Sequence, residues 1–435
     1  MKNLLKVCLL VTLSAIGIGK TFGQFVWTKD AHNPVLSGGA AGAWNRQIDQ
    51  PCVIFNNDSS RYEMWFEASS GTSSDWRPYR FGFAWSPDGV NWTMYPSPVL
   101  SPDSGAWDAY TVELPEVIRE NGQYKMWYIS YRSLTDPDYV GYATSPDGIH
   151  WTKYAGNPVM APGPAAWDAG GPWGMSVMPI SGGYKMWYAA FNSLSLPPPH
   201  HTTIGYATSA DGITWVKDTT KANPVLGLDS VGKWDDAFMA FPQVLQRGKT
   251  YYMWYTGSRS TFDPVEIGAA TSDDSGKTWK RYSLNPVLSP SGTGWDGNSV
   301  EVGTVLWRGD TLDMWYDGSA NPTSTNLWRI GLARAEITAI SERMGGLPHE
   351  YSLAQNYPNP FNPSTTIKYK MPQVSQVNLT VFDILGREVS VLVNEREDAG
   401  VHEVSFDGSG LASGVYFYRL KAGEFMQTKR FLLLK

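Results

Sequence analysis

Three acidic residues share one repeated position in the sequence and could perform acid–base chemistry together. Six residues after the tryptophan of successive Trp-Asp pairs stand Glu113, Trp173, Ala240 and Glu301, and alignment on a following proline adds Asp49 from a shorter first copy. Two carboxyl groups about 6 to 10 Å apart can flank a glycosidic bond, one donating a proton and the other activating water. Repulsion between them raises at least one pKa and so retains that proton. Asp49, Glu113 and Glu301 are therefore the candidate catalytic residues.

This position belongs to an internal repeat of about 63 residues that occurs five times. Its most regular marker is a Met-Trp pair followed by an aromatic residue, with tryptophans at Trp65, Trp127, Trp187, Trp254 and Trp315. An Asp-Gly type of turn followed by Trp occurs only four times, and the segment around Trp27 matches the strand that should follow the missing fifth turn. Each repeat holds about four strand-like runs, which is typical of a propeller blade. We predict an all-β fold with a five-bladed β-propeller over residues 24–338, closed by an N-terminal strand.

The antiparallel order of strands in a blade places further polar and aromatic residues on the same rim as the acids. These candidate substrate-binding residues are Glu67, Trp76, Arg80, Trp173, His200, His201, Asp317, Trp328 and Arg329. Aromatic faces suit stacking on sugar rings. The recurring Trp-Asp, Met-Trp and Asp-Gly elements are expected to be structural. Three alternatives stay open for the acids: they bind a central cation, they pair with arginines, or the alignment slips by one residue in the first repeat.

The N-terminus reads as a secretory signal peptide over residues 1–23. Lys2 and Lys6 precede an apolar run through Ile18, and small residues precede Gln24. An N-terminal membrane anchor is the alternative, which Lys20 disfavours because it ends the apolar run early. Removal of the signal peptide leaves one cysteine, so no internal disulfide is expected.

Composition excludes several classes of protein. The 435 residues are 14% aromatic and only 17% charged, with a net charge of −6. Disorder and long helical bundles do not fit this profile, and the negative charge argues against nucleic acid as a partner. The sequence shows no zinc-type spacing, phosphate-binding glycine loop or nucleophile elbow. We expect a monomer without a cofactor, and no ligand motif supports a central cation.

Residues 351–435 form a separate module after a linker at 339–350. Alternating apolar residues between Gly- and Asn-rich turns predict a small antiparallel β-sandwich. The stretches at 352–367, 381–389 (Val-Phe-Asp-Ile-Leu-Gly-Arg-Glu-Val), 411–420 (Leu-Ala-Ser-Gly-Val-Tyr-Phe-Tyr-Arg-Leu) and 429–435 closely resemble the type A C-terminal sorting domain of the type IX secretion system. The resemblance implies recognition by that machinery and passage from the periplasm across the outer membrane, usually with removal of the domain and often with attachment to the cell surface, so the protein is expected to be secreted or on the cell surface. A carbohydrate-binding domain is the alternative.

The repeat region resembles the five-bladed glycosidase superfamily, which includes glycoside hydrolase families 43, 32 and 130. The resemblance rests on the five blades, the acids on inner strands, the Met-Trp strands, the run at residues 49–54 and Gly-Tyr-Ala-Thr-Ser-Pro-Asp-Gly-Ile-His-Trp at residues 141–151. In families 43 and 32 the acids sit in blades one, two and three. Here the third blade carries Trp173, and Glu301 of the fifth blade supplies the third acid.

These observations lead to one main hypothesis and two alternatives. The first is an exported glycosidase acting on neutral oligo- or polysaccharides, with Asp49 as base or nucleophile and Glu113 or Glu301 as general acid. The second is a non-catalytic cell-surface glycan-binding protein that uses the aromatic rim. The third is a sialidase-like enzyme, because residues 272–279 have the form of an Asp-box. Five blades and only two rim arginines disfavour it.

Overall fold

The computed structural model describes two compact units. The described residues are 24–71, 77–192, 202–218, 223–259, 264–309, 311–320, 327–338, 351–372, 374–397, 400–423 and 425–435. Residues 25–337 make up one unit, and the second contains the described residues from 351 onward. The expected signal peptide and linker lie outside the described residues. Within these ranges no helix is long and apolar enough to cross a membrane.

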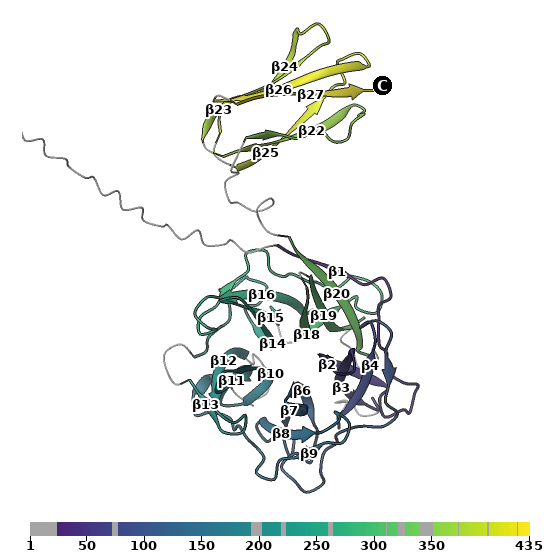
Figure 1. The fold of residues 1–435 in the computed structure, drawn as a ribbon, viewed down its shortest axis with the longest axis vertical. Helices are drawn as coiled ribbons and strands as arrows, with labels where there is room; N and C mark the ends of the chain where they lie inside the picture. Colours follow the sequence, from purple (N-terminus) through teal and green to yellow (C-terminus); the bar gives the residue numbers. More distant parts are fainter. Residues whose placement is uncertain are drawn as a thin grey trace, which may run out of the picture. The chain divides into compact units, whose positions relative to one another are not determined.

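The first unit consists of five four-stranded antiparallel sheets arranged around an axis (Figure 1). Blade 1 contains β2 (Gln47–Asn56), β3 (Arg61–Ser69), β4 (Arg80–Ser86) and β5 (Thr93–Met94). Blade 2 contains β6 (Glu113–Glu120), β7 (Gln123–Ser130), β8 (Tyr139–Ser145) and β9 (Thr152–Lys153). Blade 3 contains β10 (Gly171–Ile180), β11 (Gly183–Phe191), β12 (Thr202–Ser209) and β13 (Trp215–Lys217). Blade 4 contains β14 (Phe238–Arg247), β15 (Thr250–Ser258), β16 (Glu266–Ser272) and β17 (Lys280–Arg281).

Blade 5 joins the two ends of the propeller. It contains β18 (Ser299–Arg308), β19 (Thr311–Ser319) and β20 (Arg329–Thr338), with β1 (Gln24–Lys29) as the outer strand. The inner strands β2, β6, β10, β14 and β18 contact one another in a ring. The five-bladed propeller and its closure by an N-terminal strand are therefore confirmed.

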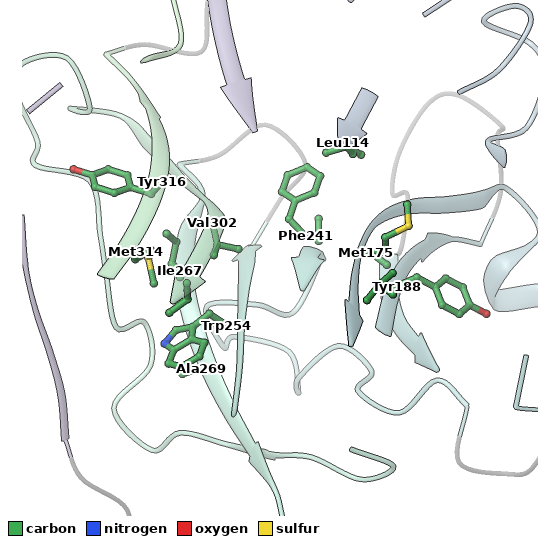
Figure 2. Packing of buried hydrophobic residues seen from close by; sticks show 14 of the residues in the cluster. Leu114, Met175, Tyr188, Phe241, Trp254, Ile267, Ala269, Val302, Met314 and Tyr316 are labelled. Atoms are coloured by element: carbon green, nitrogen blue, oxygen red, sulfur yellow. The ribbon is translucent and has the colours of Figure 1, made fainter. Parts of the chain in front are cut away.

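The tryptophans of the Met-Trp marker lie between blades and have no exposed surface. Figure 2 shows Trp254 beside Ile267 and Ala269 of its own blade. In four blades the indole Nε1 donates to the glycine carbonyl of an Asp-Gly type turn in the next blade, as from Trp65 to Gly148 at 2.7 Å. Trp254 Nε1 is buried without a hydrogen-bond partner among the described residues. In blade 5 the outer strand β1 comes from the N-terminal end of the chain, so no turn connects it to β20. The glycine carbonyl that would accept from Trp254 is therefore missing.

The Trp-Asp marker forms a buried ion pair inside each of four blades. The aspartate binds a cation of the outermost strand, as in Lys217 Nζ to Asp168 Oδ2 at 2.7 Å, and a tyrosine hydroxyl lies next to it. Blade 1 replaces all three members by Asn45, Met94 and Phe66, and Asn45 Nδ2 contacts Met94 Sδ. A neutral set therefore occupies the same place as the ion pair. The marker is structural, as the sequence indicates.

Blade 1 suggests a direct test of this ion pair in blade 3. Replacement of Lys217 by Met should cost about 3 to 5 kcal/mol of unfolding free energy, because it leaves the carboxylate of Asp168 buried and unpaired. The double variant Lys217→Met/Asp168→Asn should recover most of that loss, since it recreates the neutral pair of blade 1. Urea denaturation of both variants measures the difference. Equal losses would contradict the explanation.

The second unit is a two-sheet antiparallel sandwich. One sheet contains β21 (Ser352–Leu353), β22 (Ser364–Met371) and β25 (Gly400–Asp407). The other contains β23 (Ser375–Phe382), β24 (Glu388–Glu397), β26 (Gly414–Ala422) and β27 (Phe425–Leu433). A separate hydrophobic core, which includes Tyr418 and Phe431, holds them together. The predicted β-sandwich is therefore confirmed.

Candidate active site

The strand register shows that the candidate acids occupy one equivalent position. In each blade the buried tryptophan of the second strand pairs with a residue of the inner strand, and these residues are Cys52, Glu116, Ser176, Gln243 and Thr304. Three residues before them stand Asp49, Glu113, Trp173, Ala240 and Glu301. The alignment therefore does not slip in blade 1.

An irregularity in the inner strands follows this position and links neighbouring blades. Gln50 and Leu114 have positive φ angles of 49° and 57°, and the ladder shifts register there. The Leu114 N–H donates to Glu67 Oε1 at 2.5 Å, and the Gln50 N–H donates to Asp317 Oδ1 at 3.3 Å. Each of these carboxyl groups belongs to the preceding blade. Because a buried N–H needs an acceptor, Glu67 and Asp317 have a structural task.

Thr256 performs the same task in blade 4 without a charge. Its hydroxyl accepts the Val302 N–H of the next blade at 3.0 Å. Thr256 pairs with Ala240, as Glu67 pairs with Asp49 and Asp317 pairs with Glu301. A neutral acceptor is thus sufficient for the architecture, although blades 1 and 5 use acids.

Asp49 retains its proton at neutral pH in this environment. Burial raises the pKa of Asp49 to about 8, and the charges of Glu301 and Glu113 add to the rise, while a hydrogen bond from Gln47 opposes it. Gln47 Nε2 lies 3.1 Å from Asp49 Oδ2. Asp49 Oδ1 is buried and has no hydrogen-bond partner among the described residues. A buried carboxyl with a raised pKa has the property that a general acid requires.

Glu301 and Asp317 form a second carboxyl pair across β18 and β19. Burial raises the pKa of Glu301 to about 7, although Gln50 Nε2 donates to Glu301 Oε2 at 2.7 Å. Burial and the neighbouring Glu301 and Asp49 carboxylates hold the pKa of Asp317 well above its usual range. The two side chains interact, since each carboxyl group affects the pKa of the other.

Glu113 differs from the other acids because it has a cationic partner. Arg77 Nε lies 2.7 Å from Glu113 Oε1, and the Tyr131 hydroxyl donates to the same oxygen at 3.1 Å. Charge repulsion from Glu113 does act on Asp49 and Glu67, so these carboxyl groups form one electrostatic cluster. Among the three inner-strand acids, pairing with a described arginine is observed only for Glu113.

The remaining candidates have different surroundings. Arg80 and Arg329 open β4 and β20, where they pair with Ala68 and Gly318, the residues that follow Glu67 and Asp317. Trp328, next to Arg329, is half-buried. Trp173 is also half-buried, since it stacks on Phe191 at 4.7 Å between centroids and packs edge-on against Phe238 and Phe241. Trp76, His200 and His201 lie outside the described residues.

The axial channel is too small for a sugar ring. It is lined by residues from all five inner strands, including Gln50, Leu114, Met175, Gln243 and Val302, and has room for about one water molecule. A substrate would therefore bind at the mouth rather than within the channel. The described residues contain no group of three or more His, Cys, Asp or Glu side chains placed to hold a metal ion.

Sequence reasoning missed several polar residues of the site. Arg77, Tyr131 and Gln47 carry no repeat marker, and nothing in their spacing connects them with the acids. Gln50 directly follows Asp49 and could have been found from the alignment. Glu116 could also have been found, because it occupies an inner-strand position where it accepts the Val177 N–H of the next blade at 2.8 Å.

The raised pKa of Asp317 predicts a pH-dependent stability. The folded state keeps the Asp317 proton above pH 3.8, where the unfolded chain loses it, so stability falls as pH rises. Asp317→Asn retains the acceptor and removes the titration. Its melting temperature should exceed that of the wild type by about 2 °C or more at pH 8, with a smaller gain at pH 5.

Asp211→Asn is the matched control in that experiment. Backbone N–H groups of Thr214 and Ile213 lower the pKa of Asp211 to about 2, so this residue is ionised in both states between pH 5 and 8. Its replacement should lower the melting temperature equally at both pH values. A gain for Asp317→Asn that does not grow with pH would contradict the assigned charge state.

Comparison with known proteins identifies the C-terminal unit. The family described as the secretion system C-terminal sorting domain matches residues 355–434. The resemblance noted in the sequence is therefore confirmed, and the domain indicates type IX secretion to the cell surface or outside the cell.

The propeller is similar to solved glycoside hydrolases and phosphorylases. A glycosyl hydrolase from Bacteroides ovatus is 18% identical with a TM-score of 0.56, covering 72% of this chain and 94% of that chain. A β-1,2-mannobiose phosphorylase from Listeria innocua is 15% identical with a TM-score of 0.55, covering 72% and 97%. A structure described for the GH130 family of mannoside phosphorylases, said to contain hydrolases of β-1,2-mannosidic linkages in Candida mannan, is 18% identical with a TM-score of 0.56, covering 72% and 94%.

The chain is also similar in sequence to a curated protein. A protein of Mycobacterium tuberculosis strain H37Rv, described as uncharacterized, is 29% identical over 231 residues, which are 51% of this chain and 72% of that protein. The chain thus joins a propeller with the fold of glycoside hydrolase-like proteins to a type IX secretion sorting domain.

Proposed function

We propose that the protein is an exported glycosidase that cleaves neutral oligo- or polysaccharides by paired-carboxylate acid–base chemistry. The observation that carries this proposal is the difference in charge state between two equivalent acids. Asp49 has its pKa raised to about 8, whereas Glu113 is bound by the Arg77 guanidinium. A proton donor and an anionic carboxylate from adjoining blades are the pair that glycosidic bond cleavage needs.

The electrostatics favour a division of roles opposite to the one expected from sequence. Asp49 would donate its proton to the glycosidic oxygen as the bond to the sugar breaks. Glu113 would accept a proton from the attacking water or stabilise the positive charge that develops on the sugar. Glu301 acts on Asp49 through its charge, which raises the pKa of the donor.

The charge of the cluster favours water over phosphate as the acceptor. Asp49, Glu67, Glu113, Glu301 and Asp317 are all carboxyl groups, and the cation ion-paired within the cluster is Arg77, already bound to Glu113. A phosphate dianion at this position would be repelled by the members of the cluster that are ionised. We therefore propose hydrolysis rather than phosphorolysis.

Amide variants test the assigned acids. Asp49→Asn and Glu113→Gln should each lower kcat on a cleaved chromogenic glycoside by at least about 100-fold, because each removes one half of the acid–base pair. Arabinosides, xylosides, fructosides and mannosides form the substrate panel, with and without inorganic phosphate. Release of chromophore measures turnover.

Glu120→Gln is the matched control, because Glu120 lies at the far end of β6 from Glu113 and binds Lys125. This variant should retain wild-type activity. Full activity in both Asp49→Asn and Glu113→Gln would reject the site. Glycan binding without any released sugar would support the non-catalytic alternative, and activity only with phosphate would reject water as the acceptor.

The pH dependence of turnover gives a second test. Activity should fall as pH rises through about 8, because Asp49 then loses the proton that it donates. The profile of kcat/KM between pH 4 and 10 measures this alkaline limb. In Glu301→Gln the limb should move to lower pH, since the charge that helps to raise the pKa of Asp49 is gone. An unchanged limb in that variant would contradict the coupling.

A further inference from the structure

We propose that Arg77 is the positioning residue that keeps Glu113 as the anionic member of the acid–base pair. The inference rests on the proposed function and adds a residue outside the inner strands. Arg77 belongs to the connection between β3 and β4 in blade 1, whereas Glu113 begins β6 in blade 2. The ion pair therefore crosses the interface between two blades.

The ion pair between Arg77 and Glu113 is short and largely buried. Arg77 Nε lies 2.7 Å from Glu113 Oε1, with side chains exposed by 27% and 5%. Tyr131 supports both partners, since its hydroxyl donates to the same Oε1 at 3.1 Å and its ring centroid lies 5.7 Å from the guanidinium carbon. Tyr110 packs on Tyr131 with 5.7 Å between centroids. Three side chains thus fix the orientation of one carboxyl group.

Both donors use the same oxygen of Glu113. Oε1 accepts from Arg77 and from Tyr131, so this oxygen is held in place. We assign the other oxygen, Oε2, to the acceptor role toward water or the sugar. A carboxylate that is anchored through one oxygen presents the other in a fixed direction, which suits a base.

The other groups that act on Glu113 would not keep it ionised. Asp49, Glu67 and Asp138 interact with it electrostatically as carboxyl groups. Tyr79 and Tyr131 are the neighbouring phenols, and burial with nearby carboxylates raises the pKa of Tyr79 well above its usual range. Arg77 supplies the positive charge in this set. Without it, a buried carboxyl surrounded by acids takes up a proton.

Arg77→Gln should therefore change the pH dependence of turnover as well as its rate. We expect kcat at pH 6 to fall at least 10-fold and the acid limb of the kcat profile to move up by at least one pH unit, with KM changed less than 3-fold. Arg77→Lys should restore most of the loss, because it returns the charge. Tyr131→Phe should give a smaller shift in the same direction.

Arg119→Gln is the matched control. Arg119 belongs to β6, the strand of Glu113, and binds the exposed carboxylate of Asp58. It should leave the acid limb unchanged. If Arg77→Gln lowers only the melting temperature and leaves the limb in place, Arg77 merely ties two blades together and the proposal is overturned.

A spectroscopic measurement decides the question without turnover. Carbon NMR of protein labelled at the glutamate δ-carboxyl, with Glu113→Gln used to assign the signal, reports the charge of Glu113 at pH 5.5. We expect an ionised group in the wild type and a protonated one in Arg77→Gln. An ionised group in both would overturn the role of Arg77. If no glycoside is cleaved by the wild type, the proposed function fails while this result still stands.

Discussion

The structure depends on hydrogen bonds that cross between neighbouring blades beside the channel, and at one equivalent position they are observed at three of the five junctions. The irregularity in the inner strands turns a backbone N–H toward the preceding blade, and a buried N–H without an acceptor costs about 1 to 3 kcal/mol. Glu67, Thr256 and Asp317 provide acceptors at one equivalent position. Glu67 pairs with Asp49, and Asp317 pairs with Glu301. Two of the three acceptors therefore also bring carboxyl groups close together at the mouth of the channel.

The crowding gives equivalent acids different charge states. Asp49 is buried beside other carboxyl groups and keeps its proton, whereas Glu113 contacts a guanidinium. Thr256 shows that a neutral side chain satisfies the same architecture, so the hydrogen bond itself does not require the acids of blades 1 and 5, and burial raises the pKa of Asp317 there. Destabilising groups concentrated at one mouth are typical of a functional site.

The sequence was sufficient to predict the features that follow from the internal repeat. The spacing of Trp65 and its four equivalents predicted the blades, the match around Trp27 predicted the closing strand, and the offset from Trp-Asp predicted the common position of the acids. Arg77 could not be found, because it reaches Glu113 from another blade and follows no periodicity. The proposed role of Asp49 as proton donor could not be found either, since the pKa of Asp49 depends on burial that arises only when the five inner strands meet.

Direct observation of the Asp49 proton tests the central claim. Carbon NMR of protein labelled at the aspartate γ-carboxyl, with the signal assigned from Asp49→Asn, follows this group through a titration from pH 4 to 10. The account predicts that the signal is that of a protonated carboxyl at pH 7 and changes near pH 8. A carboxylate signal at pH 5 and above would contradict Asp49 as the proton donor, and with it the proposed chemistry.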